Sequence, residues 1–221
     1  MLTAIALGFT LGLRHAADPD HVAAIAALLG RQAPGATASR GARAALSLGA
    51  AWGLGHSLVI LAVGGVFVAL RISVVPGWAL GAEAAVAVIL VAVGLSNLRT
   101  LWLGPHDTHQ HRPDETRRSG RTLALRALGI GMAHGLAGSA AVALLALAAM
   151  PSVAAALVYL LIFGVGTIGG MVAMSLGLGV PALLASERPR LLPWVLGGSG
   201  ALSVAVGLLL LVEVGIATRL F

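Results

Sequence analysis

Five of the eight residues in the segment RHAADPDH, from Arg14 to His21, are ionisable or titratable. The segment lies in the middle of an apolar stretch at 2–29, roughly 18 Å of helix from either end. Such side chains are costly at the centre of a membrane unless they are paired or solvated, so a functional role is the first hypothesis. Two imidazoles and two carboxylates suit a divalent transition metal such as nickel, cobalt or zinc. The first candidate ligands are His15, Asp18, Asp20 and His21.

Pro19 predicts a break in this first helix. Proline removes a backbone donor and disfavours the helical conformation at the preceding residue, here Asp18. Asp18 would then be the N-cap of a second half-helix with Pro19 at its first position. On an unbroken helix His15 and His21 would point about 240° apart, so a shared metal requires either this bend or ligands from other helices.

Two histidines in other apolar segments are candidate additional ligands. His56 lies in GLGHS and His134 in GMAHG, and glycines flank both. The alternative for each is a hydrogen bond between helices without any metal. Ser57, Ser139 and Thr167 are candidates for orienting these ligands, although such residues are also common in helix packing.

Three further polar features leave alternatives open. Arg14 could pair with Asp18, four residues further on. Glu83 and Glu213 sit near the ends of their apolar segments and are interpreted as interfacial, with a proton relay as the alternative. The segment HDTHQH at 106–111 could hold metal loosely near a pore mouth or could be a solvated loop.

The composition predicts an integral membrane protein. Of the 221 residues, 58% are hydrophobic and 10% are charged, and the mean hydropathy is +0.98. The chain has no cysteine, which excludes disulfides, thiolate metal sites and cysteine nucleophiles. Its basic residues are all arginines, and the net charge of +6 is interpreted as an orientation signal in a membrane rather than as affinity for nucleic acid.

Six apolar segments predict an all-α protein with six transmembrane helices. They are long enough to span with some tilt, at roughly 2–29, 44–70, 77–103, 123–148, 152–180 and 190–217. Most arginines fall in the loops of one face, which the positive-inside rule makes cytoplasmic. Both termini are therefore expected outside a cell (inner) membrane. The N-terminus has no basic region that would indicate a signal peptide, so the first helix is expected to stay.

The two halves of the sequence resemble each other. Residues 11–28 align with 130–147, and residues 51–59 align with 162–170. The alignment predicts a 3+3 inverted repeat, as in many secondary transporters, within one transmembrane domain at 1–221. Its parts are a first repeat at 1–103, a cytoplasmic His-rich loop at 104–122 and a second repeat at 123–221. The alternative is that helices rich in alanine and glycine align with each other in any case.

Two motifs on successive helices resemble the nickel/cobalt transporter family (NiCoT, within the NicO superfamily). His15, Asp20 and His21 match its HX4DH signature, and WGLGHSLVIL at 52–61 is similar to its second motif. The chain lacks the later motif of the longer, eight-helix members and looks more like the shorter, urease-associated branch. The resemblance implies nickel or cobalt transport that depends on the first-helix motif. Exporters belong to the superfamily too, so the resemblance leaves the direction open.

The expected function is a permease for a divalent metal, most plausibly Ni²⁺ or Co²⁺, that works by alternating access. The metal is the transported substrate, no cofactor is expected, and a homo-oligomer is compatible with the sequence. An intramembrane metal-dependent enzyme is the main rival, but the chain has no HExxH motif, so it is expected not to be an enzyme. A metal sensor or assembly subunit is a third alternative.

Overall fold

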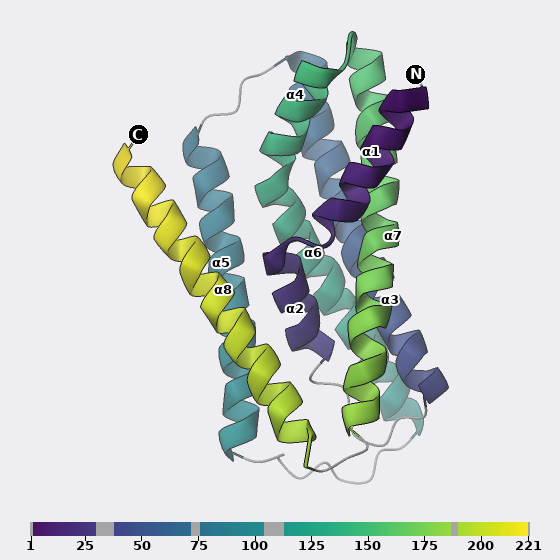
Figure 1. The fold of residues 1–221 in the computed structure, drawn as a ribbon, viewed down its shortest axis with the longest axis vertical. Coiled ribbons are helices and arrows are strands. Elements are labelled where there is room, and N and C mark those ends of the chain that lie inside the picture. The colour runs from purple at the N-terminus through teal and green to yellow at the C-terminus, as the bar shows by residue number, and fades with distance from the viewer. Residues whose placement is uncertain (1, 30–37, 72–75, 104–112, 187–189, 221) are drawn as a thin grey trace.

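The computed structural model describes residues 2–29, 38–71, 76–103, 113–186 and 190–220, and these residues are helical throughout, apart from short turns (Figure 1). The helices run roughly along the long axis, and both termini lie at the same end. In chain order they are α1 (Leu2–His15), α2 (Pro19–Leu29), α3 (Ala38–Val59), a π-helical turn η1 (Ile60–Gly64), α4 (Gly65–Leu70), α5 (Pro76–Leu103), α6 (Pro113–Ala149), α7 (Val153–Ser186) and α8 (Leu192–Leu220).

The first apolar segment is broken where the sequence predicts it. α1 ends at His15, three residues are non-helical, and α2 begins at Pro19. The amide of Val22 donates to the carbonyl of Asp18 at 3.0 Å, which places Asp18 at the N-cap of α2. Proline fits the first position of a helix because its missing N–H has no partner there. The predicted break at Asp18 and Pro19 is therefore confirmed.

Among the described residues, four helical segments are long and apolar enough to cross a membrane, at 41–70, 77–103, 153–181 and 193–218. The broken first segment contributes only the shorter apolar helix α2 to this search. Large apolar side chains face outward, including Leu58, Trp102 and Leu209, as expected for surfaces that contact lipid. The count of six spans stays a prediction.

The helix after the predicted cytoplasmic loop begins earlier than the apolar segment at 123–148. Residues 113–122 were expected in the cytoplasmic loop at 104–122, but α6 begins at Pro113 and continues through them. Proline is favoured at the first helical position, which fits this start. The His-rich segment 106–111 lies outside the described residues.

Glycines bring pairs of helices into backbone contact. A Cβ on Gly49 would lie 2.7 Å from the carbonyl oxygen of Met171, and one on Gly53 would lie 2.9 Å from the Cα of Ile168, so α3 and α7 pack closely. On α6, Gly131 packs on the backbone of Trp52 and Gly135 on that of His56. The close approach that the sequence predicts at these four glycines is confirmed.

The two halves of the chain make matching contacts. The register of the sequence alignment pairs Gly12 with Gly131 and Trp52 with Phe163. The structure packs Gly12 of α1 on the carbonyl of Phe163 in α7, and Gly131 of α6 on the carbonyl of Trp52 in α3. The same register relates the contact of Gly166 with the carbonyl of Phe9 to that of Gly55 with the carbonyl of Leu128.

A third matching pair of contacts joins α5 and α8. Gly94 packs on the carbonyl of Gly200, and Gly207 packs on that of Ala87. The distances that a Cβ would have to these oxygens are 2.6 and 2.8 Å. Each of these contacts made by one half thus has an equivalent in the other half.

Two buried cores support the site from either side. One is built around Trp52, Leu48, Ile25 and Leu90, and the other around Tyr159, Leu160 and Ile60.

The α5–α8 pair is tied to α2 by the buried Asn97, whose Nδ2 donates to the carbonyl of Ala27 at 2.7 Å. This bond satisfies one of the last carbonyls of the half-helix, which have no partner within α2.

Candidate metal centre

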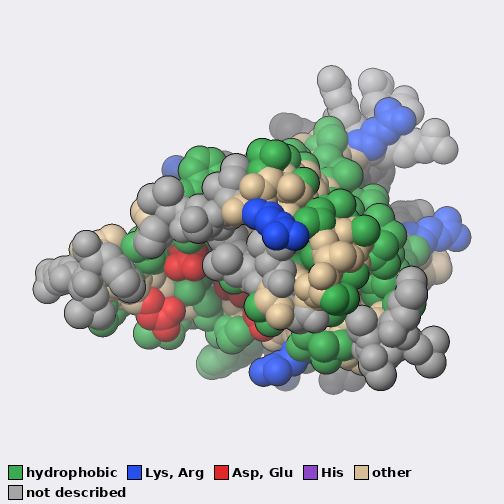
Figure 2. Space-filling model, turned by 90° about the horizontal axis from the view of Figure 1, so that it is seen from above, with side chains coloured by type: hydrophobic (Ala, Val, Ile, Leu, Met, Phe, Trp, Pro, Cys, Tyr) green, Lys and Arg blue, Asp and Glu red, His purple; other side chains and the backbone are tan. Residues whose placement is uncertain are grey.

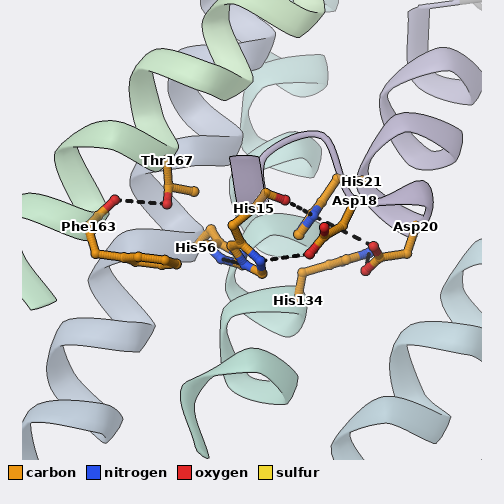
Figure 3. A network of polar contacts seen from close by, with 8 residues as sticks. All are labelled: His15, Asp18, Asp20, His21, His56, His134, Phe163 and Thr167. Atoms are coloured by element: carbon orange, nitrogen blue, oxygen red, sulfur yellow. Dashed lines mark hydrogen bonds and ion pairs between the residues drawn. The ribbon is translucent and has the colours of Figure 1, made fainter. Parts of the chain in front are cut away.

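All six candidate ligands converge on the break between α1 and α2 (Figure 3). They come from the end of α1, the linker, the first turn of α2, the last turn of α3 and the middle of α6. The side chains of His15, His21 and His56 each offer a ligand atom, and these atoms all lie within 4.8 Å of one another. The same holds for Asp18, Asp20 and His21. The ring centroids of His15 and His21 are only 4.9 Å apart, so the break brings them together as the bend argument requires.

Pro19 shapes the site through the hydrogen bond that it lacks. In a continuous helix the carbonyl of His15 would accept from the amide of residue 19, which is a proline and has none. The amide of Asp18 donates to this carbonyl at 3.1 Å, and the Nδ1–H of His21 donates to it at 3.1 Å. The break and the orientation of the His21 ring therefore have the same origin.

Three of the four rings have their Nδ1 facing an oxygen that only accepts. His15 Nδ1 donates to Oδ2 of Asp18 at 2.8 Å, His21 Nδ1 to the carbonyl of His15, and His134 Nδ1 to the carbonyl of Ile130 at 3.0 Å. The hydrogen on Nδ1 leaves the lone pair on Nε2. This is how metal-binding histidines are usually held, with the other ring nitrogen fixed by a carboxylate or a carbonyl.

The Nε2 atoms of His15 and His56 face each other at 3.0 Å. Because the Nδ1 of His15 carries the hydrogen, His56 donates from Nε2 in this arrangement, and its buried Nδ1 has no hydrogen-bond partner among the described residues. Two ligands of one ion with bonds of about 2.1 Å lie roughly 3 to 4 Å apart. An ion at this place would replace the contact between the two imidazoles.

The centre is deeply buried at the imidazoles and more open at the carboxylates. Side-chain exposure is 2% for His21 and 1% for His134, against 25% for Asp20 and 47% for Asp18. Oδ2 of Asp20 lies 3.9 Å from Nε2 of His134, and its Oδ1 lies 3.6 Å from Nδ1 of His21. The Nε2 atoms of His21 and His134 are buried without a hydrogen-bond partner among the described residues. The unpaired Nε2 of His134 beside the Asp20 carboxylate fits a cation site, because a buried polar atom without a protein partner calls for an ion or a water.

Two aromatic residues that the sequence reasoning missed line the centre. Trp52 is fully buried and lies 4.9 Å from His134 and 6.4 Å from His21, measured between ring centroids. Phe163 lies 5.4 Å from His15. Trp52 is four residues before His56, one helical turn away, and Phe163 occupies the same place in the second half. This spacing of one helical turn from a candidate ligand was the signal in the sequence that could have identified Trp52.

The predicted orienting residues act differently from the expectation. Ser57 donates to the carbonyl of Gly164, Thr167 to that of Phe163 and Ser139 to that of Leu136. The hydrogen bonds of these three hydroxyls thus go to backbone carbonyls and not to the ligands. The ligands are oriented instead by Asp18 and by the carbonyls of His15 and Ile130.

The expected pairing of Arg14 with Asp18 is not what the structure has. The carboxylate of Asp18 pairs with His15, and Arg14 is exposed. Glu83 and Glu213 are also exposed, and they lie in the halves of α5 and α8 nearer the end that carries both termini. Figure 2 looks onto that end and shows acidic side chains exposed among hydrophobic ones.

Comparison with known proteins gives one relative over the full chain. The sequence is 29% identical over 225 residues to the urease accessory protein UreH of Bacillus sp. (strain TB-90), covering 100% of this chain and 96% of that protein. It is 25% identical over 220 residues to the chloroplast protein FOR GROWTH AND FERTILITY 2 of Arabidopsis thaliana, covering 96% of this chain but only 57% of that one. No family model and no solved structure matches the chain.

The relative of similar length is named as an accessory protein, and this name agrees with the expectation that the chain is not an enzyme. The apolar helices indicate a membrane protein.

Proposed function

We propose that this protein transports a divalent transition metal, Ni²⁺ or Co²⁺, across a membrane by alternating access around the centre at the α1–α2 break. The observation that carries the proposal is the convergence of His15, His21 and His56 within 4.8 Å beside two carboxylates. Imidazole nitrogen suits nickel, zinc and copper, whereas carboxylates alone suit magnesium and calcium. The ion is the transported substrate, and no resident cofactor is part of the proposal.

Charge and proton balance favour a dication. Asp18 and Asp20 together offset two positive charges, and the histidines bind as neutral imidazoles. Protons compete with the metal for these lone pairs. Metal binding and release are thereby coupled to protonation of the centre.

The matching contacts of the two halves support an inverted 3+3 repeat. In this proposal the six apolar segments all cross the inner membrane, and both termini face the outside because the arginine-rich loops face the cytoplasm. The ligands then lie near the midplane, where inverted-repeat transporters bind their substrates. Rocking of the two halves about the glycine contacts would expose the centre to one side at a time.

The full-length relative supports nickel as the cargo. Its name links it to urease, which is a nickel enzyme. The resemblance of RHAADPDH and WGLGHS to the nickel/cobalt transporter family points the same way. A catalytic metal is disfavoured, because among the described residues the histidines and carboxylates at the centre are all candidate ligands, which leaves no separate general base.

The test is uptake of radioactive nickel and cobalt into sealed proteoliposomes that contain only this chain. Flux is measured in both directions and under imposed pH gradients of either sign. His21→Ala and His56→Ala are expected to abolish flux, and Ser203→Ala is the control because Ser203 bonds to Leu90, away from the centre. Normal transport by both histidine variants would refute the ligand assignment.

A further inference from the structure

Five of the six candidate ligands form two overlapping groups. The imidazole set consists of His15, His21 and His56, and the acidic set consists of Asp18, Asp20 and His21. Within each set the ligand atoms lie within 4.8 Å of one another, and His21 belongs to both. Figure 3 shows His15 and His56 on one side of the centre and Asp20 and His134 on the other.

We propose, on the basis of the proposed function, that these are two successive positions of one ion, an acidic capture position and an imidazole selectivity position, with His21 as the ligand common to both. A neutral imidazole has a single lone pair, so His21 binds one ion at a time. The two positions therefore exclude each other, and an ion moves between them while it keeps its bond to His21.

Burial sets the order of the two positions. The carboxylates of the acidic set are the most open part of the centre, at 47% and 25% exposure, whereas in the imidazole set His15 is 19% exposed and His56 is fully buried. An ion from solvent meets the acidic set first, where two negative charges compensate for the loss of its water. The His134 ring reinforces this position, since its buried Nε2 has no hydrogen-bond partner among the described residues and faces Oδ2 of Asp20 at 3.9 Å.

The chemistry of the ligands assigns different tasks to the two positions. Oxygen ligands accept hard cations such as Mg²⁺ and Ca²⁺ as well as transition metals. Three imidazole nitrogens disfavour hard cations, and Ni²⁺ and Co²⁺ tolerate them well. The acidic set therefore captures divalent cations in general, and the imidazole set rejects magnesium.

Equilibrium binding of Co²⁺ to the full chain in detergent micelles tests this arrangement separately from transport. His56→Gln removes a ligand from the imidazole set alone, and Asp20→Asn removes one from the acidic set alone. Ser203→Ala is the matched buried control on α8. The visible absorption of Co²⁺ reports its ligands, Mg²⁺ serves as the competitor, and circular dichroism verifies the helical fold.

Wild-type protein is expected to bind one Co²⁺ that a roughly thousandfold excess of Mg²⁺ does not displace. His56→Gln is expected to bind one Co²⁺ at least about tenfold more weakly, because loss of a ligand costs at least as much as loss of an orienting partner. Mg²⁺ should now displace this ion. Asp20→Asn is expected to keep resistance to Mg²⁺ but to bind Co²⁺ more slowly in stopped-flow mixing.

Three outcomes would overturn the two-position arrangement. Two Co²⁺ ions in the wild type would show that the positions do not exclude each other. Equal and complete loss of binding in His56→Gln and Asp20→Asn would show a single composite site. An association rate unchanged by Asp20→Asn would remove the capture step, whether or not His56→Gln folds. Failure of the wild type to bind or transport either Ni²⁺ or Co²⁺ would instead refute the proposed function itself.

Discussion

Replacing Gly135 by alanine tests whether backbone contact between α3 and α6 sets the geometry of the centre. A Cβ at this position would lie 3.0 Å from the Cα of His56 and closer still to its carbonyl oxygen, whereas ordinary contact begins at 3.4 Å. The two helices must therefore separate by roughly half an ångström or more, since packed interiors have no spare room. His56 would move away from His15, whose Nε2 it now meets at 3.0 Å.

Displacements of this size matter at a metal centre, where ligands must be held within about 0.5 Å of their working positions. We expect Gly135→Ala to weaken Co²⁺ binding by about tenfold or more and to destabilise the fold by about 1–3 kcal/mol, as overpacking does. The measurements are Co²⁺ titration and thermal unfolding in micelles. Gly129→Ala is the matched control on the same helix, because a Cβ there has nothing within 4 Å. If both variants bind Co²⁺ like the wild type, the helix contact does not position His56.

Three further predictions follow from the same geometry. Pro19→Ala restores an amide that competes with His21 for the carbonyl of His15. Co²⁺ affinity should therefore fall about tenfold while the helix content stays the same. A titration that gives unchanged affinity would contradict the role of the break. Asn97→Ala removes the bond to Ala27, and we expect the free energy of unfolding, followed by thermal unfolding, to fall by about 1 kcal/mol. The affinity for Co²⁺ should change little. Lowering the pH from neutral to acid should weaken Co²⁺ binding in the wild type because protons occupy the imidazole lone pairs, and binding that strengthens toward acid pH would argue against neutral histidine ligands.

Much of the centre could be predicted from the sequence because its determinants are local. Asp18 and Pro19 break the helix through backbone chemistry alone, and the flanking residues are then fixed in the linker or in the first turn of α2. His56 and His134 were identifiable because a titratable side chain in an apolar helix needs a reason to be there. The glycine contacts followed from the small size of glycine at helix interfaces.

What sequence reasoning could not supply was the direction of individual side chains. Arg14 and His15 are neighbours, and either could pair with Asp18 on spacing alone; the structure chooses His15. The hydroxyls of Ser57 and Thr167 had carbonyls of helix α7 within reach, which take them away from the ligands. The start of α6 at Pro113 was missed because its first residues are polar, and the sequence there has no apolar pattern that would predict a helix.

Under the proposed function, the matching contacts of the two halves bear on why the centre would bind one ion rather than two. In the register of the halves, His134 stands where the first half has His15, but Thr167 stands in place of His56 and Gly138 in place of Pro19. The scaffold has a twofold pattern, and the ligands do not share it. Two complete ligand sets about one axis would place two dications next to each other. In this proposal the unequal division of ligands allows the glycine contacts about which the halves rock to stay symmetric, while the centre binds only one dication.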